Sequence, residues 1–346
     1  MHYDAAMAST PTINDLARHL GVHKSTVSRA MDPARRHLIG PALLQRVEAA
    51  ARELGYRPNR AAAALSTGRS KTVGVMLPDI TNPVFPPILR GIEDALDAEG
   101  YFALLANTAR RDGAAQAAVE RMQAQRVEGF LIATAVRDDA WLDTLRAGGA
   151  AIVLVNRTDG RGLLPAVVSD DMLGMRLAVD HLVALGHRRI AHLAGPQDLS
   201  TGAGRRIGFE QAMRAHGLRP SAVFECAAYS IEAGSAAAAQ LLARGTRVTA
   251  TAWVAANDLI ALGALQAAQH AGIDVPARLS LVGHNDMPLL DQVAPPLTSV
   301  RIRHYDMGLR AARLLLAMLA GTPGSGDATV VLRPQLVVRA STAPPA

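Results

Sequence analysis

Cations and hydroxyls gather in one short stretch near the amino terminus, between Lys24 and Arg29. Ammonium, guanidinium and hydroxyl groups bind phosphates, and arginine also reads base edges in a DNA groove. Val27 and Met31 recur at helical spacing, so a helix over Lys24–Met31 would bury them. The polar side chains left outside are then Lys24, Ser25, Ser28 and Arg29, which is the pattern of a recognition helix.

Two further helices are predicted to hold that helix in place. Thr12 is a good N-cap for a helix that ends at Gly21, and Asp15 stands in the capping-box position. Pro41 suits the first turn of a covering helix. Two short helices joined by a tight turn, with a third across them, form a helix-turn-helix domain. The apolar residues at helical spacing are Ile13, Leu16, Ala17 and Leu20, and then Leu43, Val47, Ala50 and Leu54.

Positive charge is concentrated in the same region. Residues 1–70 carry ten of the 36 basic side chains and five of the 30 acidic ones. The rest of the chain is therefore nearly neutral. Cations near phosphates give DNA affinity that depends on salt, so this distribution favours a nucleic-acid partner for the first seventy residues.

Length and composition indicate a protein of two or three units without a membrane segment. The chain has 346 residues, 49% of them hydrophobic, and no apolar run long enough to span a bilayer. Its start, MHYDAAMAST, lacks the cationic and apolar regions of a secretory signal, so we expect a cytoplasmic protein. The single cysteine, Cys226, excludes an intrachain disulfide.

From Thr72 onward, apolar strand runs alternate with amphipathic helices. Such alternation predicts parallel sheets, and two sets of it predict an α/β core of two doubly wound subdomains. Ligands bind outside the carboxyl ends of parallel strands, so the polar residues at those ends are candidate ligand contacts. These are Asp79, Thr81, Asn82, Phe85, Asn156, Arg157, Asp170, Thr201, Arg205, Tyr229, Asn257 and Asn285.

Several blocks of sequence resemble the LacI/GalR family of bacterial transcription regulators, in the order of that family. They are GVHKSTVSRAM, ELGYRPNRAAAAL, STGRSKTVGVMLPDITNPVF, LGHRRIAHLAGP, ANDLIALGAL and PPLTSVR. The resemblance implies a repressor that binds palindromic operator DNA as a homodimer. It also implies a periplasmic-binding-protein-like core of two lobes with a small effector between them. For the DNA contacts, the resemblance assigns base reading to Lys24, Ser25 and Arg29. It assigns phosphate contacts to His19, Thr26 and Ser28.

The resemblance also divides the chain. Residues 1–10 would be a disordered tail, 11–57 the helix-turn-helix domain, 58–70 a hinge and 71–346 the effector and dimerisation domain. Lobe one is expected at about 71–168 and 299–327, and lobe two at about 169–298 and 328–340.

The hinge is expected to fold on DNA. Its alanine-rich stretch after Asn59 is too short to be a stable helix alone. In the family, the matching segment levers a leucine into the minor groove, and Leu65 stands at that place; Asn59 is a further expected contact. Two departures stand out: Ala63 replaces the usual Arg, and His23 replaces the usual Ser at the cap of the recognition helix.

For the effector, the family resemblance places a clamp on Arg205 and ring stacking on Tyr229. Asn257 falls on the family's AND motif, and Asn285 replaces an Asp that binds sugar hydroxyls. A neutral amide beside two arginines favours a sugar acid or another polar, anionic metabolite over a neutral sugar. Leu199 replaces a base-contacting Arg of the purine-responsive member, which disfavours a purine.

Other functions have weaker support. TGRSKT lacks the spacing of a phosphate loop, and His181, His187 and His192 do not share one face as metal ligands would. No catalytic motif is recognisable, so neither an enzymatic activity nor a cofactor is expected. The alternative that remains is a transport receptor for sugars, or a sugar-modifying enzyme, on the same two-lobe core.

Overall fold

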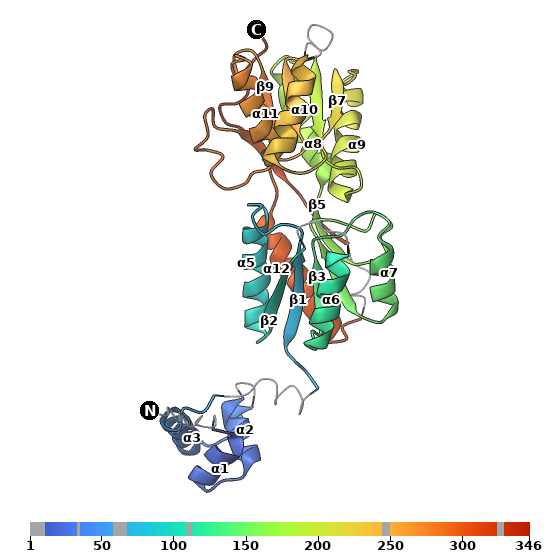
Figure 1. Cartoon of the computed structure of the whole chain (residues 1–346). Coiled ribbons are helices and arrows are strands. Elements are labelled where there is room, and N and C mark those ends of the chain that lie inside the picture. The colour runs from blue at the N-terminus through green and yellow to red at the C-terminus, as the bar shows by residue number, and fades with distance from the viewer. Residues whose placement is uncertain (1–10, 33–34, 58–67, 109–112, 244–249, 324–328) are drawn as a thin grey trace, which may run out of the picture. The chain divides into compact units, whose positions relative to one another are not determined.

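The computed structural model describes residues 11–32, 35–57, 68–108, 113–243, 250–323 and 329–346 (Figure 1). The chain divides into two compact units: unit 1 is Met1–Ser70 and unit 2 is Lys71–Ala346. This division coincides with the predicted end of the hinge. Among the described residues, no helix combines the length and apolarity needed to cross a membrane.

Unit 1 is the predicted three-helix domain. The side chain of Thr12 accepts a hydrogen bond from the backbone N of Asp15, whose carboxylate accepts from the backbone N of Thr12 in return. Gly21 ends the first helix at φ 65°, a conformation that glycine adopts without strain. Leu16, Val27 and Val47 are fully buried where the three helices meet. The helices are α1 (Ile13–Leu20), α2 (Lys24–Met31) and α3 (Pro41–Glu53), with a short 3-10 turn at Arg36–Leu38.

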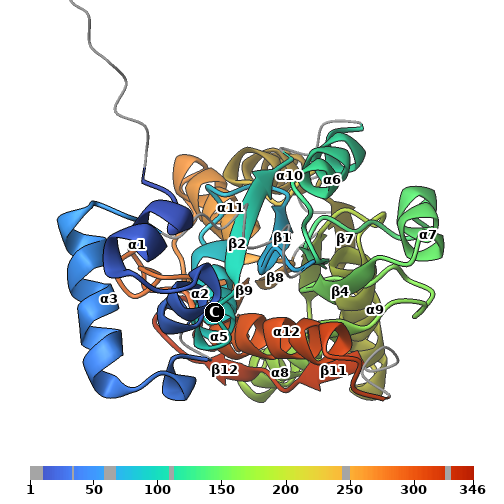
Figure 2. The same ribbon diagram turned by 90° about the horizontal axis from the view of Figure 1, so that it is seen from below.

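Lobe one of unit 2 is built on a parallel sheet, sheet A. Its strand order is β11-β5-β4-β3-β1-β2. Helices α5 and α12 lie side by side on one face, and α6 and α7 pack on the other (Figures 1 and 2). The strands are β1 (Thr72–Leu77), β2 (Phe102–Asn107), β3 (Gly129–Ile132), β4 (Ala151–Val155), β5 (Ala166–Ser169) and β11 (Thr329–Leu332). The helices are α5 (Phe85–Ala98), α6 (Ala114–Ala124), α7 (Ala140–Ala147) and α12 (His304–Leu319).

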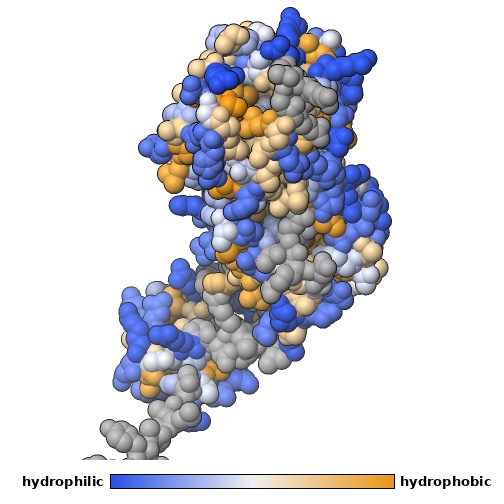
Figure 3. All heavy atoms as spheres, turned by 45° about the horizontal axis from the view of Figure 1, so that its top comes forward, coloured by the Kyte–Doolittle hydropathy of each residue, from blue (hydrophilic) through white to orange (hydrophobic). Residues whose placement is uncertain are grey.

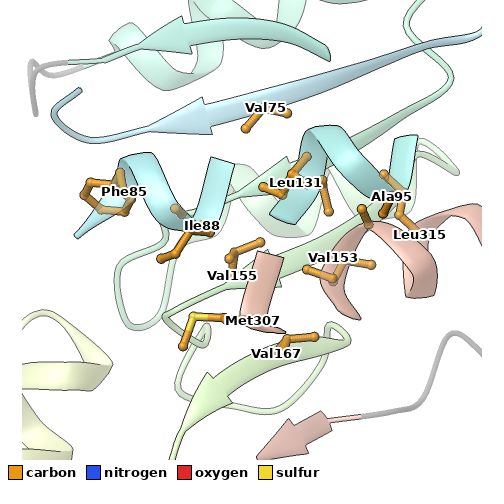
Figure 4. Packing of buried hydrophobic residues seen from close by; sticks show 14 of the residues in the cluster. Val75, Phe85, Ile88, Ala95, Leu131, Val153, Val155, Val167, Met307 and Leu315 are labelled. Atoms are coloured by element: carbon orange, nitrogen blue, oxygen red, sulfur yellow. The ribbon is translucent and has the colours of Figure 1, made fainter. Parts of the chain in front are cut away.

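The core between sheet A and helices α5 and α12 is continuous and apolar. Val75, Leu131 and Val153 project from neighbouring strands toward Ile88 of α5 and Leu315 of α12 (Figure 4). All five side chains are at most 1% exposed. Strands buried in this way read as short apolar runs, which is why the sequence revealed them.

Lobe two is built on sheet B, with the order β12-β10-β9-β8-β6-β7. All neighbours are parallel except β12, which runs antiparallel to β10. The strands are β6 (Ile190–Ala194), β7 (Ala222–Glu225), β8 (Ala252–Ala255), β9 (Ser280–Asn285), β10 (Thr298–Arg301) and β12 (Gln335–Val337). The helices are α8 (Asp171–Ala184), α9 (Ser200–Ala215), α10 (Ile231–Ala243) and α11 (Asp258–His270).

The predicted lobe boundaries near the carboxyl terminus were wrong. Residues 299–327 were assigned to lobe one from Ser299 onward, but β10 pairs with β9 in sheet B, so lobe two continues to Arg301. Residues 328–340 were assigned to lobe two, but Thr329–Leu332 pairs with β5 in sheet A. These strands are only four residues long, and strand partners far away in the sequence decide their sheet.

The outer edge of sheet A is apolar and exposed. Phe102, Leu104 and Leu105 of the edge strand β2 are 44%, 37% and 41% exposed. Elsewhere, on the face of the molecule drawn in Figure 3, hydrophobic residues form small patches among hydrophilic ones. An unprotected apolar edge strand is a surface on which another chain can pair.

Candidate functional site

Helix α2 exposes its polar side chains because its apolar ones belong to the core of unit 1. Val27 and Ala30 are 0% and 4% exposed and pack with residues of α1 and α3. Ala30 thus takes the inward place that was predicted for Met31, which is half-buried. The predicted contacts Lys24, Ser28 and Arg29 are exposed, Ser25 and Thr26 are half-buried in the first turn, and His19 is exposed at the end of α1.

His23 is the N-cap of α2. Its Nδ1 accepts a hydrogen bond from the backbone N of Ser25 at 3.2 Å and lies 2.8 Å from the Ser25 hydroxyl. A backbone N–H can only donate, so Nδ1 is unprotonated and the ring carries its proton on Nε2. Histidine at position 23 therefore caps the first turn of α2 and holds the Ser25 side chain in place.

Two predicted DNA contacts cannot be placed. Asn59 and Leu65, like the departure at Ala63, lie outside the described residues. The predicted fold of the hinge on DNA therefore stays a prediction.

A polar cleft lies where strand ends of sheets A and B meet in unit 2. It is narrow and partly open to solvent. Nine of the twelve predicted ligand contacts line it, and Val84 is the one lining residue that was not predicted. The nine are Asn82, Phe85, Asn156, Arg157, Thr201, Arg205, Tyr229, Asn257 and Asn285.

Arg205 on α9 is the best-held side chain of the cleft. Its Nε donates to the carboxylate of Asp171 at 2.8 Å, and one terminal nitrogen donates to the carbonyl of Ala256 at 2.7 Å. The other terminal nitrogen donates to Oδ1 of Asn285 at 3.3 Å. The side chain of Arg205 is 3% exposed, so these bonds replace water and fix the guanidinium plane.

Three asparagines of the cleft are also held by the protein. Oδ1 of Asn257 accepts from the backbone N of Ile260, which makes Asn257 the N-cap of α11. Oδ1 of Asn82 accepts from the backbone N of Val84 at 3.2 Å. Asn285 is 5% exposed and has φ 112°, a conformation rare for any residue except glycine. These side chains are therefore in place before a ligand arrives.

Tyr229 closes the lobe-two side of the cleft. Its hydroxyl donates to Oγ1 of Thr201 at 3.1 Å, and its ring centroid lies 5.9 Å from Cζ of Arg205. The distance suits an interaction between the cation and the ring face. Tyr229, predicted to stack on the effector, thus lies beside Arg205, predicted to bind it.

Three predicted contacts do not line the cleft. Oδ1 of Asp79 accepts from both the backbone N and the hydroxyl of Thr81, and both residues are exposed. Asp170 is the N-cap of α8 and accepts from the backbone N of Leu173. The sequence placed them correctly at strand ends, but their oxygens are engaged in local turns and caps.

Sequence reasoning missed Asp171, which carries the ion pair with Arg205. It is the first residue of α8, next to the predicted Asp170, so only its position at a helix start could have indicated it. Burial raises the pKa of Asp171, and the charge of Arg205 opposes that rise.

The backbone contacts that join the lobes were also missed. The N of Arg137 donates to the carbonyl of Asp198 at 2.8 Å, and the N of Thr158 donates to the Ser200 hydroxyl at 2.9 Å.

Other buried ionisable groups stand behind the cleft. Burial raises the pKa of Asp258 to about 7, although it accepts from the Ser299 hydroxyl and the backbone N of Met287. Burial and the nearby Arg205 hold the pKa of His284 well below its ordinary value, so His284 is neutral. Burial also raises the pKa of the Cys226 thiol to about 12, which makes it a poor nucleophile.

The three clustered histidines have structural partners. His187 lies within 3.0 Å of the Ser280 hydroxyl and 2.8 Å of the Ala343 carbonyl, and His181 lies 3.0 Å from the Thr342 hydroxyl. Nδ1 of His192 lies 2.8 Å from the carbonyl of Val254. Within the described part of the chain, no group of three potential ligands is placed to hold a metal ion.

Comparison with known proteins defines the class. Residues 12–59 match the model of bacterial regulatory proteins of the lacI family, and residues 179–342 match a periplasmic binding protein-like domain. The HTH-type transcriptional regulator MalR of Streptomyces coelicolor is 35% identical over 345 residues, covering 96% of this chain and 97% of MalR. The HTH-type transcriptional repressor CytR of Escherichia coli is 32% identical, covering 96% of each chain.

Solved structures agree. The lac repressor dimer bound to operator and the anti-inducer ONPF has a TM-score of 0.86 and 30% identity, covering 96% of this chain and 99% of the repressor. The transcriptional regulator CelR in complex with cellobiose has a TM-score of 0.74 and 31% identity, with the same coverage. A helix-turn-helix unit joined to two α/β lobes with a polar cleft between them is a transcriptional regulator. The chain belongs to the lacI family of bacterial regulatory proteins.

Proposed function

We propose that this protein is a cytoplasmic repressor that binds palindromic operator DNA as a homodimer. A small polar metabolite, a sugar or sugar acid, binds in the cleft and changes the affinity for DNA. The protein acts by binding and not by catalysis. The observation that carries the proposal is the polar face of α2, where Lys24, Ser28 and Arg29 are exposed over a packed core.

The DNA partner is supported by the chemistry of that face. Lys24 and Arg29 are cations on a helix short enough to enter the major groove, and Arg29 can pair with the edge of a guanine. His19 and the hydroxyls of Thr26 and Ser28 suit phosphate oxygens on either side. The lac repressor dimer that this chain resembles was solved bound to operator.

The homodimer is supported by the edge strand β2. Phe102, Leu104 and Leu105 of this strand are exposed in the single chain. A second copy would cover them around a two-fold axis, which also matches the symmetry of a palindromic site. The lac repressor that resembles this chain is a dimer.

The effector role is supported by the way the cleft is built. Residues from both sheets line it, and bonds such as that from Thr158 to Ser200 join the lobes beside it. A ligand that contacts both lobes stabilises one angle between them over others. CelR was solved with cellobiose, so a carbohydrate occupies the same fold in that relative.

The experiment measures binding of the full chain to duplexes selected from a random-sequence pool, at several salt concentrations. We expect selected duplexes to bind far more tightly than random ones, with log K falling linearly with log salt. Lys24→Ala should weaken binding and flatten that slope. Arg214→Ala, which removes an exposed cation from α9 in unit 2, should change neither. Equal affinity for selected and random duplexes would overturn the proposal.

A further inference from the structure

The described lining of the cleft contains no acidic residue. Among the described residues around it are two arginines, four asparagines, a threonine and a tyrosine, but neither Asp nor Glu. Neutral sugars present hydroxyls that donate as well as accept, and carboxylates are the strongest acceptors for them. The cleft therefore lacks the side-chain type that best binds a donor.

The asparagines also offer donors more than acceptors. Backbone N–H groups bind Oδ1 of Asn82 and of Asn257, and a guanidinium N–H binds Oδ1 of Asn285. Each partner can only donate, which fixes the oxygen as the bound atom and leaves the NH2 group for a ligand.

The remaining polar groups have the same bias. Oγ1 of Thr201 accepts from Tyr229, which leaves the Thr201 hydroxyl proton to donate. Arg205 retains further N–H groups on its terminal nitrogens after bonding Asp171, Ala256 and Asn285. Donor groups from both lobes thus converge on one small volume.

Two guanidinium groups line the cleft. Asp171 compensates the charge of Arg205, but it holds Nε from the side of α8 and does not line the cleft. Arg157, 5% exposed, adds a second positive charge to the lining. A buried anion in this place would gain from both guanidinium groups and from the amide donors.

We infer that the cleft selects an anionic polyol, a sugar bearing a carboxylate or a phosphate, over a neutral sugar, and that Asn285 and Asn257 determine this choice. The inference deepens the proposed effector role and rests on it. Carboxylate and phosphate share the acceptor oxygens that the donors require. An aspartate at either position would place a negative charge against the ligand's own.

The test uses calorimetric titration of the full chain with glucose, glucuronate and glucose 6-phosphate at one ionic strength. We expect at least one of the anions to bind about tenfold or more tighter than glucose. Asn285→Asp should lower the anion's affinity about tenfold or more while sparing or improving that of glucose. Asn257→Asp should act in the same direction and keeps the helix cap, since Asp caps as well as Asn.

Gln240→Glu is the matched control, because it makes the same amide-to-carboxylate change at an exposed site on α10. It should leave all three affinities unchanged. Tighter binding of glucose, or binding of none of the three, would overturn the inference, as would an unchanged preference in both aspartate variants. Tighter binding of the phosphate than of the uronate would assign the anion to a phosphate ester. Selective binding to duplex DNA, which tests the proposed function, is measured separately and can succeed when this inference fails.

Discussion

The exposed polar face of α2 and the cleft of unit 2 differ in how firmly the protein holds their side chains. Lys24 and Arg29 are exposed, with no side-chain bond that fixes either within the described residues. Arg205 and Asn285 are 2% and 5% exposed and already bonded to each other. The DNA partner would order the side chains on α2, whereas the fold itself orders the side chains of the cleft.

The difference decides what a substitution does. Removing an exposed cation from α2 takes away a contact with DNA and leaves the fold almost unchanged. Removing a held group from the cleft also breaks the bonds that anchor its neighbours, so stability and binding fall together. The following predictions test this contrast, from the largest expected effect to the smallest.

Arg205→Ala should destabilise unit 2 by about 3–5 kcal/mol, because it leaves the carboxylate of Asp171 largely buried without its partner. Denaturant unfolding of the full chain, followed by fluorescence of Trp253 in sheet B, measures the loss. Asp171→Asn in the same chain should recover part of it. The neighbouring Arg206→Ala is the control: its ion pair with Glu210 is partly exposed, so the change should be about 1 kcal/mol or less. Equal losses at the two arginines would contradict the contrast.

Acid should lower the free energy of unfolding of unit 2, because His192 is buried in its neutral form. Burial lowers its pKa from 6.5 to about 4, so the folded state keeps the ring neutral while the unfolded chain takes up a proton near pH 6.5. The stability from the neutral ring is present above that pH and is lost as pH falls toward 4, by about 3 kcal/mol. His192→Asn keeps an N–H for the carbonyl of Val254 and removes the titration. Its free energy of unfolding should fall less steeply with acid than that of the wild type; parallel curves would contradict the prediction.

Arg29→Ala should cost about 1–3 kcal/mol of DNA binding, and mainly at one base pair of the site. Stability should stay within about 0.5 kcal/mol, because the side chain is exposed. Competition between duplexes that differ at single positions measures the effect. Arg18, whose side chain is 80% exposed on α1, provides a comparison: Arg18→Ala should weaken binding evenly or not at all. An even loss for Arg29→Ala would reassign Arg29 to a phosphate contact.

His23 is held at the start of α2 by its bonds to Ser25, so its replacement should affect stability as replacement of a cleft residue does, but less. His23→Ala should destabilise unit 1 by about 1 kcal/mol through loss of the N-cap, and His23→Ser should restore it. Thermal unfolding of the two variants against the wild type measures this. If His23→Ala and His23→Ser are equally stable, the imidazole does not act as the cap.

The sequence predicted unit 1 almost completely because its signals are local. Apolar spacing, the capping box at Thr12 and the stop at Gly21 lie within a few residues of what they determine. The same holds for β1 and β4, whose apolar runs reveal a buried parallel strand. The rule that ligands bind at strand ends then brought nine residues to one cleft.

The failures concern information that is distant along the chain. Thr298–Arg301 and Thr329–Leu332 are too short to show a period, and only their strand partners assign them to a sheet. Asp171 bonds Arg205, which is 34 positions away. Asp79 and Asp170 show a related limit, since a strand end predicts a polar residue there but not whether its oxygens already bond a turn or cap.

The central claim is that DNA binding through α2 and ligand binding in the cleft of unit 2 are coupled, so that each changes the affinity for the other. Its most direct test is the affinity of the full chain for a selected duplex, with and without a saturating ligand found by titration. We predict a change of about fivefold or more, lost in Asn285→Asp at the same ligand concentration and matched by an equal change of ligand affinity on adding the duplex. A ligand that binds fully and leaves the affinity for the duplex unchanged would contradict the account.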